Sequence, residues 1–184
     1  MAASLLALFG ALSFLDGVYL HLWRFRLQER PESRYEHLTH TWRAVLFIPI
    51  LALLFLVDAG GWLLWTGIAF LLADLVVEIA DARSERDSRS WQGGLTTGEY
   101  ILHLVLTGVR VAGVTLALAA KPAAAWLLDA PLRLSTAPTA LSLVAELMLP
   151  GAVLVAALHV LLVLRPMLLR ELCAAWPVRY CSSR

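Results

Sequence analysis

The sequence EHLTHTWR occupies residues 36–43 and leads directly into the uncharged apolar run AVLFIPILALLFLV over residues 44–57. At about 100° of rotation per residue in an α-helix, Glu36, His40 and Arg43 fall within roughly 60° of one another. Ionisable side chains that enter a membrane are costly and mark functional sites by default. We therefore interpret this stretch as one wall of a buried polar site at the start of a membrane span.

The composition of the whole chain is that of a membrane protein. Of its 184 residues, 60% are hydrophobic and only 16% are charged, with a mean hydropathy of +0.74. Soluble domains are about half apolar and carry about 25% charged residues. The formal net charge of +1 provides no basic patch for nucleic acid. Cys173 and Cys181 match neither a zinc motif nor a disulfide framework.

The hydrophobic runs predict an all-α, polytopic transmembrane bundle of about five spans, since each span needs about 20 residues. The expected spans cover residues 2–23, 32–57, 62–82, 97–120 and 139–164. The first is expected to be retained rather than cleaved, because Asp16 interrupts it and no basic segment precedes it. Pro49 should kink the second span, and Thr96 with Glu99 forms a capping-box pattern at the start of the fourth.

The connecting segments complete the expected organisation. We predict a solvated loop over residues 83–94 and an amphipathic surface segment over residues 165–184, within one integral membrane domain covering residues 1–184. Nearly all arginines lie after the first span, after the third span and in the tail. The positive-inside rule then places the N-terminus outside and the C-terminus in the cytoplasm, and we expect a prokaryotic inner membrane.

This topology brings distant polar residues to one level near the cytoplasmic boundary. All five histidines fall within about two helical turns of it. The candidate metal ligands are the polar residues at that level: His21, Glu36, His37, His40, Asp74, Glu78, Asp81, Glu99 and His103. Arg43 and Arg110 are expected to support a carboxylate of the site or to bind a lipid phosphate.

The carboxylates indicate a metal rather than a purely structural cluster. Asp74, Glu78 and Asp81 share one helical stripe, and Glu99 and His103 share another. Facing carboxylates repel one another unless they are protonated or neutralised. Imidazole with carboxylate suits iron, manganese or zinc, and such ligands build di-metal sites in helical bundles. The Glu-x-x-x-His spacing differs from the Glu-x-x-His of ferritin-like proteins, and the several HxxHH-type boxes of membrane hydroxylases are not present.

Three nearby residues are expected to lie outside the site. Asp16 and His21 are about 140° apart on an α-helix, so both cannot face one centre. Glu85 should be solvated at a helix end. His159 stands alone on an apolar helix and is expected to be a satisfied interhelical histidine.

We prefer a membrane metalloenzyme that acts on a lipid-like or other hydrophobic substrate from the bilayer. With iron, which we favour over zinc or manganese and which could bind as two ions, it would be an oxidoreductase. With zinc it would be a hydrolase. The catalytic carboxylates would be Glu78 and Asp81.

Two alternatives remain open at this stage. One is a haem-binding electron-transfer protein with two histidine ligands, either His40 and His103 or His103 and His159. The other is a proton or cation transporter that uses Asp74, Glu78 and His103. The transporter would need a homo-oligomer, because the chain has no repeated halves.

Overall fold

A computed structural model describes residues 1–90 and 93–175. Within these residues, the structure is all-α apart from two short strands, and five helical stretches are long and apolar enough to cross a membrane. These stretches are Ala2–Arg24, Arg34–Leu56, Gly61–Glu85, Thr97–Ala119 and Ala140–Arg165. The predicted all-α architecture with five candidate membrane spans is confirmed, whereas its orientation in the membrane stays a prediction.

The long helices are continuous with shorter segments of other geometry. The α-helices are α1 (Ala2–Phe14), α2 (Arg34–Ile50), α3 (Gly61–Ser88), α4 (Thr97–Ala119) and α5 (Ala140–Ala175). Two π-helical segments continue α1 and α2, over Leu15–Arg24 and Leu51–Leu56. Short 3₁₀ helices cover Leu27–Glu29 and Ala123–Trp126, and the strands are β1 (Asp58–Ala59) and β2 (Arg133–Ser135).

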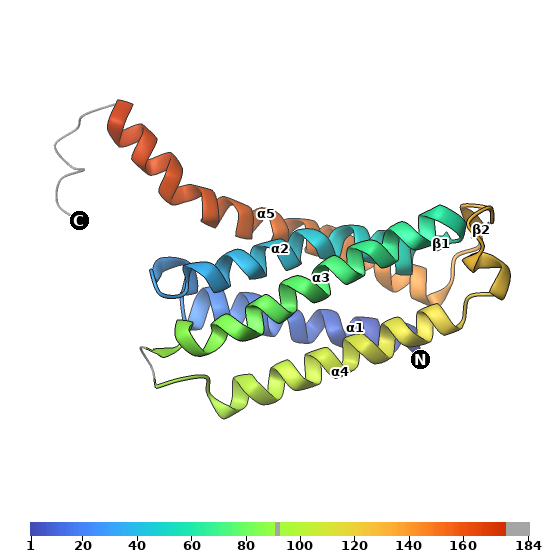
Figure 1. Ribbon diagram of the computed structural model, residues 1–184, viewed down its shortest axis with the longest axis horizontal. Helices are drawn as coiled ribbons and strands as arrows, with labels where there is room; N and C mark the ends of the chain where they lie inside the picture. The colour runs from blue at the N-terminus through green and yellow to red at the C-terminus, as the bar shows by residue number, and fades with distance from the viewer. Residues whose placement is uncertain (91–92, 176–184) are drawn as a thin grey trace.

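The helices form one bundle and run alongside one another (Figure 1). Helix α2 packs against α3 and α5, and α1 packs against α4 and α5. Strands β1 and β2 pair antiparallel at the end of the bundle that also holds the N-terminus, and the α3–α4 connection lies at the opposite end (Figure 1). The bundle therefore has two distinct ends, which differ in chemistry.

The apolar core occupies the end next to the strands. Leu6 near the start of α1, Leu64 near the start of α3 and Ala145 near the start of α5 pack there with Leu51 and Ala117, from the last turns of their spans. Such close packing of apolar side chains leaves no place for charged groups. The buried ionisable residues consequently lie towards the opposite end of the bundle, where the candidate site lies, whereas Asp58 and Lys121 pair next to the strands.

Local sequence signals account for several helix boundaries. The Thr96 side chain accepts a hydrogen bond from the backbone of Glu99, and the Glu99 side chain accepts one from the backbone of Thr96, so the predicted capping box is confirmed. Pro49 cannot donate a backbone hydrogen bond, and the helix changes to π geometry directly after Ile50.

The segment after the third span differs from the predicted solvated loop. Helix α3 continues to Ser88, and Arg89 beyond it is 0% exposed. The prediction of a solvated segment over residues 83–94 is wrong in this part, because charged partners on α2 and α4 draw Arg89 inward. In the predicted surface segment, α5 continues to Ala175, while residues 176–184 lie outside the described residues.

Candidate metal centre

A π-helical segment brings Asp16 and His21 to one centre. In a π-helix the backbone bonds run from residue i to residue i+5, so side chains five positions apart lie on the same side of the helix. Asp16 is 6% exposed and His21 is 1% exposed. Their Oδ1 and Nε2 atoms are 3.5 Å apart. The expectation that they face different directions, which assumed α-helical geometry, is wrong.

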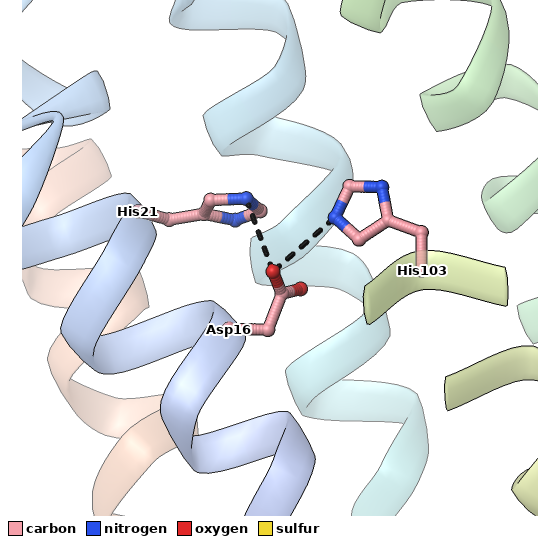
Figure 2. Close-up of side chains that lie close together, drawn as sticks. All are labelled: Asp16, His21 and His103. Atoms are coloured by element: carbon pink, nitrogen blue, oxygen red, sulfur yellow. Dashed lines mark hydrogen bonds and ion pairs between the residues drawn. The ribbon is translucent and has the colours of Figure 1, made fainter. Parts of the chain in front are cut away.

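His103 on α4 completes this group from across the bundle. Its Nε2 atom lies 3.2 Å from Asp16 Oδ1, and Figure 2 shows the Asp16 carboxylate directed between the two imidazole rings. The other ring nitrogen, Nδ1, lies 3.1 Å from Glu85 Oε1. Glu85 therefore contacts the site and is not solvated at a helix end, contrary to the sequence prediction. A carboxylate behind a histidine is the usual arrangement that orients a metal-binding imidazole.

His40 and Glu36 approach the same region from α2. The rings of His21 and His40 meet edge to face, with centroids 4.2 Å apart. His40 Nε2 lies 3.9 Å from Glu36 Oε1 and 3.3 Å from Asp81 Oδ2 on α3. Four spans therefore contribute side chains to one buried region.

Two overlapping groups of three residues here could hold a metal ion. Within each group the ligand atoms all lie within 4.8 Å of one another. The groups share His21, so we treat them as one histidine–carboxylate cluster of five residues: Asp16, His21, Glu36, His40 and His103. Asp16 is the member that the sequence prediction omitted.

Several buried atoms of this cluster lack a hydrogen-bond partner within the described part of the chain. They are both ring nitrogens of His21, Nε2 of His40 and Oε1 of Glu36. Leaving a buried polar atom unsatisfied costs about 1–3 kcal/mol, and such atoms are uncommon in folded proteins. Imidazole nitrogens and a carboxylate oxygen are suitable donors for a transition metal ion. The donor set therefore fits a bound metal.

A second buried network holds Glu36 in place. Its Oε2 atom accepts hydrogen bonds from Ser88 and from Arg89, the latter at 2.7 Å, while Oε1 is directed at His40. Arg89 also donates to Glu99 Oε1 at 3.1 Å. Glu99, a predicted ligand, is thus occupied by Arg89 and by its helix cap and lies outside the cluster.

Two other predicted ligands, Asp74 and Glu78, belong to an arginine–carboxylate network on α2, α3 and α4. Arg110 donates to both carboxylates. Arg43 lies 3.5 Å from each of them and 3.6 Å from Asp81 Oδ2. The two arginines therefore neutralise Asp74 and Glu78, which are not members of the histidine–carboxylate cluster. Asp81 connects the network to His40.

His37, also a predicted ligand, faces α5 instead of the cluster. Its ring stacks on that of His159, with centroids 5.3 Å apart and an angle of 27° between the planes. Both residues are buried. His37 and His40 are three positions apart, so on an α-helix their side chains diverge by about 60°. The structure therefore divides the histidines into a cluster of three and a separate pair.

A cavity of about 710 Å³ adjoins the cluster. Asp16, His40 and His103 line one end, and Leu6 and Phe9 line the other. A volume of this size is typical of pockets for small organic ligands. The site thus combines buried metal-ligating side chains with an apolar chamber.

Comparison with known proteins gives no family assignment. No protein-family model, curated protein or solved structure matches the chain. What can be said of its function therefore depends on the geometry: this is a candidate multi-span membrane protein whose buried His, Asp and Glu side chains could hold a metal.

Proposed function

We propose that the protein is an integral membrane metalloprotein whose histidine–carboxylate cluster binds one or two transition metal ions and that it acts as an oxidoreductase on a hydrophobic substrate. The observation that carries this proposal is the convergence of unpartnered buried donors on His21, His40 and Glu36. Arg89 and Arg110 donate hydrogen bonds to carboxylates. The buried atoms of His21, His40 and Glu36 have only ion-pair contacts of 3.3–3.9 Å and no hydrogen bond among the described residues.

The proposed ligands divide between two sides of His21. Asp16 and His103 would serve one side, with Glu85 orienting the His103 ring. Glu36 and His40 would serve the other. This division gives room for two ions, and carboxylate with histidine ligands from several helices supports iron over zinc or manganese.

Iron bound here would supply oxygen activation, with dioxygen as the oxidant and an external reductant as the electron source. Of the two predicted catalytic carboxylates, Asp81 is the better candidate for holding a proton, because it lines the cavity 3.3 Å from His40. Glu78 accepts hydrogen bonds from Arg110 and Thr107 and is better suited to positioning Arg110.

The other readings receive less support. A haem ligated by His40 and His103 would meet carboxylates at both histidines, from Asp81 and Glu36 on one side and Asp16 and Glu85 on the other. A hydrolase with zinc in the same ligands would need water in a chamber that is largely apolar. The apolar chamber favours oxidation of a hydrophobic substrate.

Elemental analysis and a visible spectrum of the purified protein test the proposal. The double variant His21→Ala, His40→Ala should lose at least one ion per chain, whereas His37→Ala is a control that removes a buried histidine outside the cluster and should retain the metal. Full metal content in the double variant would refute the assignment. A Soret band would identify the haem alternative instead, and iron-free, zinc-loaded protein would identify the hydrolase.

A further inference from the structure

The cavity beside the cluster has an axis with a polar end and an apolar end. The apolar end is lined by Leu5, Leu6 and Phe9 of α1 and by Met148 of α5. Along α1 and the π-helical segment that continues it, the distance from Leu5 to Asp16 corresponds to about 16 Å at 1.5 Å per residue. The distance from Met148 to His159 on α5 is the same. The cavity is therefore long enough to hold a single extended chain along its axis.

The arginines at the polar end are already paired with carboxylates of the protein. Five carboxylates and two arginines line the cavity, namely Asp16, Asp74, Glu78, Asp81 and Glu85 with Arg43 and Arg110. Each arginine is held by at least two of these carboxylates. No arginine among the described lining residues is left to bind an anion, and bound metal would offset most of the excess negative charge. An uncharged hydroxyl or carbonyl group suits this end best.

From this geometry we propose that the cavity binds one linear, single-chain amphiphile with an uncharged oxygen-bearing end, such as a long-chain alcohol or aldehyde. Its oxygen lies at the cluster, and its chain extends towards Leu5 and Met148. This inference rests on the proposed function and specifies the substrate class for it. The polar terminus of the amphiphile, and not the middle of its hydrocarbon chain, therefore lies next to the histidine–carboxylate cluster.

Two glycines on α4 provide a matched pair of variants. Gly113 is buried and lines the cavity, and a Cβ atom there would lie 3.5 Å from Leu5 Cβ, at the apolar end. Gly108 is exposed on the same helix, does not line the cavity, and has open space around its Cβ position. Gly113→Leu should shorten the chamber, whereas Gly108→Leu should leave it unchanged.

The first measurement is binding of linear primary alcohols, from octanol to octadecanol, to the purified protein and to both variants. Comparing each alcohol between proteins removes its partition into the detergent. Gly113→Leu should weaken octadecanol binding at least fivefold, as overpacking does, and should leave octanol binding within about twofold. Gly108→Leu should match the parent protein. Equal effects on short and long alcohols, or no effect on either, would overturn the assignment of the chain to this chamber.

The second measurement concerns the polar end and its direction. Hexadecanol should bind more tightly than hexadecanoate and hexadecylamine, and equal or tighter binding of either ion would overturn the choice of an uncharged end. A photoreactive group at the methyl terminus should crosslink near Leu5 or Met148, and one beside the hydroxyl should crosslink near Asp16 or His103. The reversed pattern would overturn the orientation.

Metal content, measured on the same preparations, reports on the proposed function separately. Metal-free protein that still selects long alcohols and loses that selection in Gly113→Leu would overturn the metal centre while supporting the cavity assignment. Metal-loaded protein with no chain-length selection would support the metal centre and overturn the cavity assignment.

Discussion

Removing the Arg89 side chain should weaken both the fold and the metal site. Arg89 is fully buried, and its guanidinium lies 2.7 Å from Glu36 and 3.1 Å from Glu99. The variant Arg89→Met keeps a long apolar side chain but leaves two buried carboxylates without their cation. Breaking a buried ion pair in this way costs about 3–5 kcal/mol. We expect the free energy of unfolding to fall by about that amount.

The same substitution should reduce metal affinity through Glu36. One oxygen of this carboxylate is held by Ser88 and Arg89, which directs the other towards His40. Loss of such an orienting partner typically lowers metal affinity by about 10- to 100-fold. Arg89→Met should therefore bind metal more weakly even at temperatures where the protein remains folded.

The assays are unfolding in a titrated denaturing detergent and metal competition with a chelator of known affinity. Arg83→Met is the matched control, because Arg83 is an exposed arginine on α3, the helix that ends directly before Arg89. It should change stability by no more than about 0.5 kcal/mol. If Arg89→Met resembles Arg83→Met in both assays, then Arg89 is not the buried cation of this network and the reasoning fails.

Two further predictions concern the edge of the site and the orientation of the chain. Glu85→Gln should lower metal affinity by about 10- to 100-fold while retaining the fold, because Glu85 orients the His103 ring; unchanged affinity in chelator competition would contradict this role. Thr136, directly after β2, and Ser90, in the α3–α4 connection, are exposed and lie at opposite ends of the bundle. In a background without the natural cysteines, an impermeant thiol reagent added outside cells should label Thr136→Cys and not Ser90→Cys. Labelling of position 90 alone would show that the orientation is the reverse of the one predicted.

Local patterns in the sequence were sufficient to predict the architecture. Five long apolar runs predicted the candidate spans, since the backbone of a membrane segment must satisfy its own hydrogen bonds as a helix. The Thr96 and Glu99 capping box was predicted from residues three positions apart. These features depend on neighbours along the chain, so periodicity and composition contain the necessary information.

The membership of the cluster was only partly predictable. His21, Glu36, His40 and His103 were identified because ionisable side chains in apolar spans are unusual. The same criterion applies to Asp16, but α-helical geometry places Asp16 and His21 about 140° apart. The π-helical segment that begins at Leu15 brings them together, and it is evident only in the structure. The charged sequence around Arg89 predicts a solvated loop. Its buried partners, Glu36 and Glu99, lie on two other helices and give no local signal.

Composition and periodicity are sufficient to predict five apolar helices and to identify the ionisable residues within them. Which of those residues come into contact is set by how the helices pack. Glu85 joins His103 and Glu99 joins Arg89, the opposite of what the stripe on each helix indicated. The physical reason is that helical periodicity gives the direction of a side chain within its own helix, while the rotation and axial offset between helices depend on packing across the whole bundle.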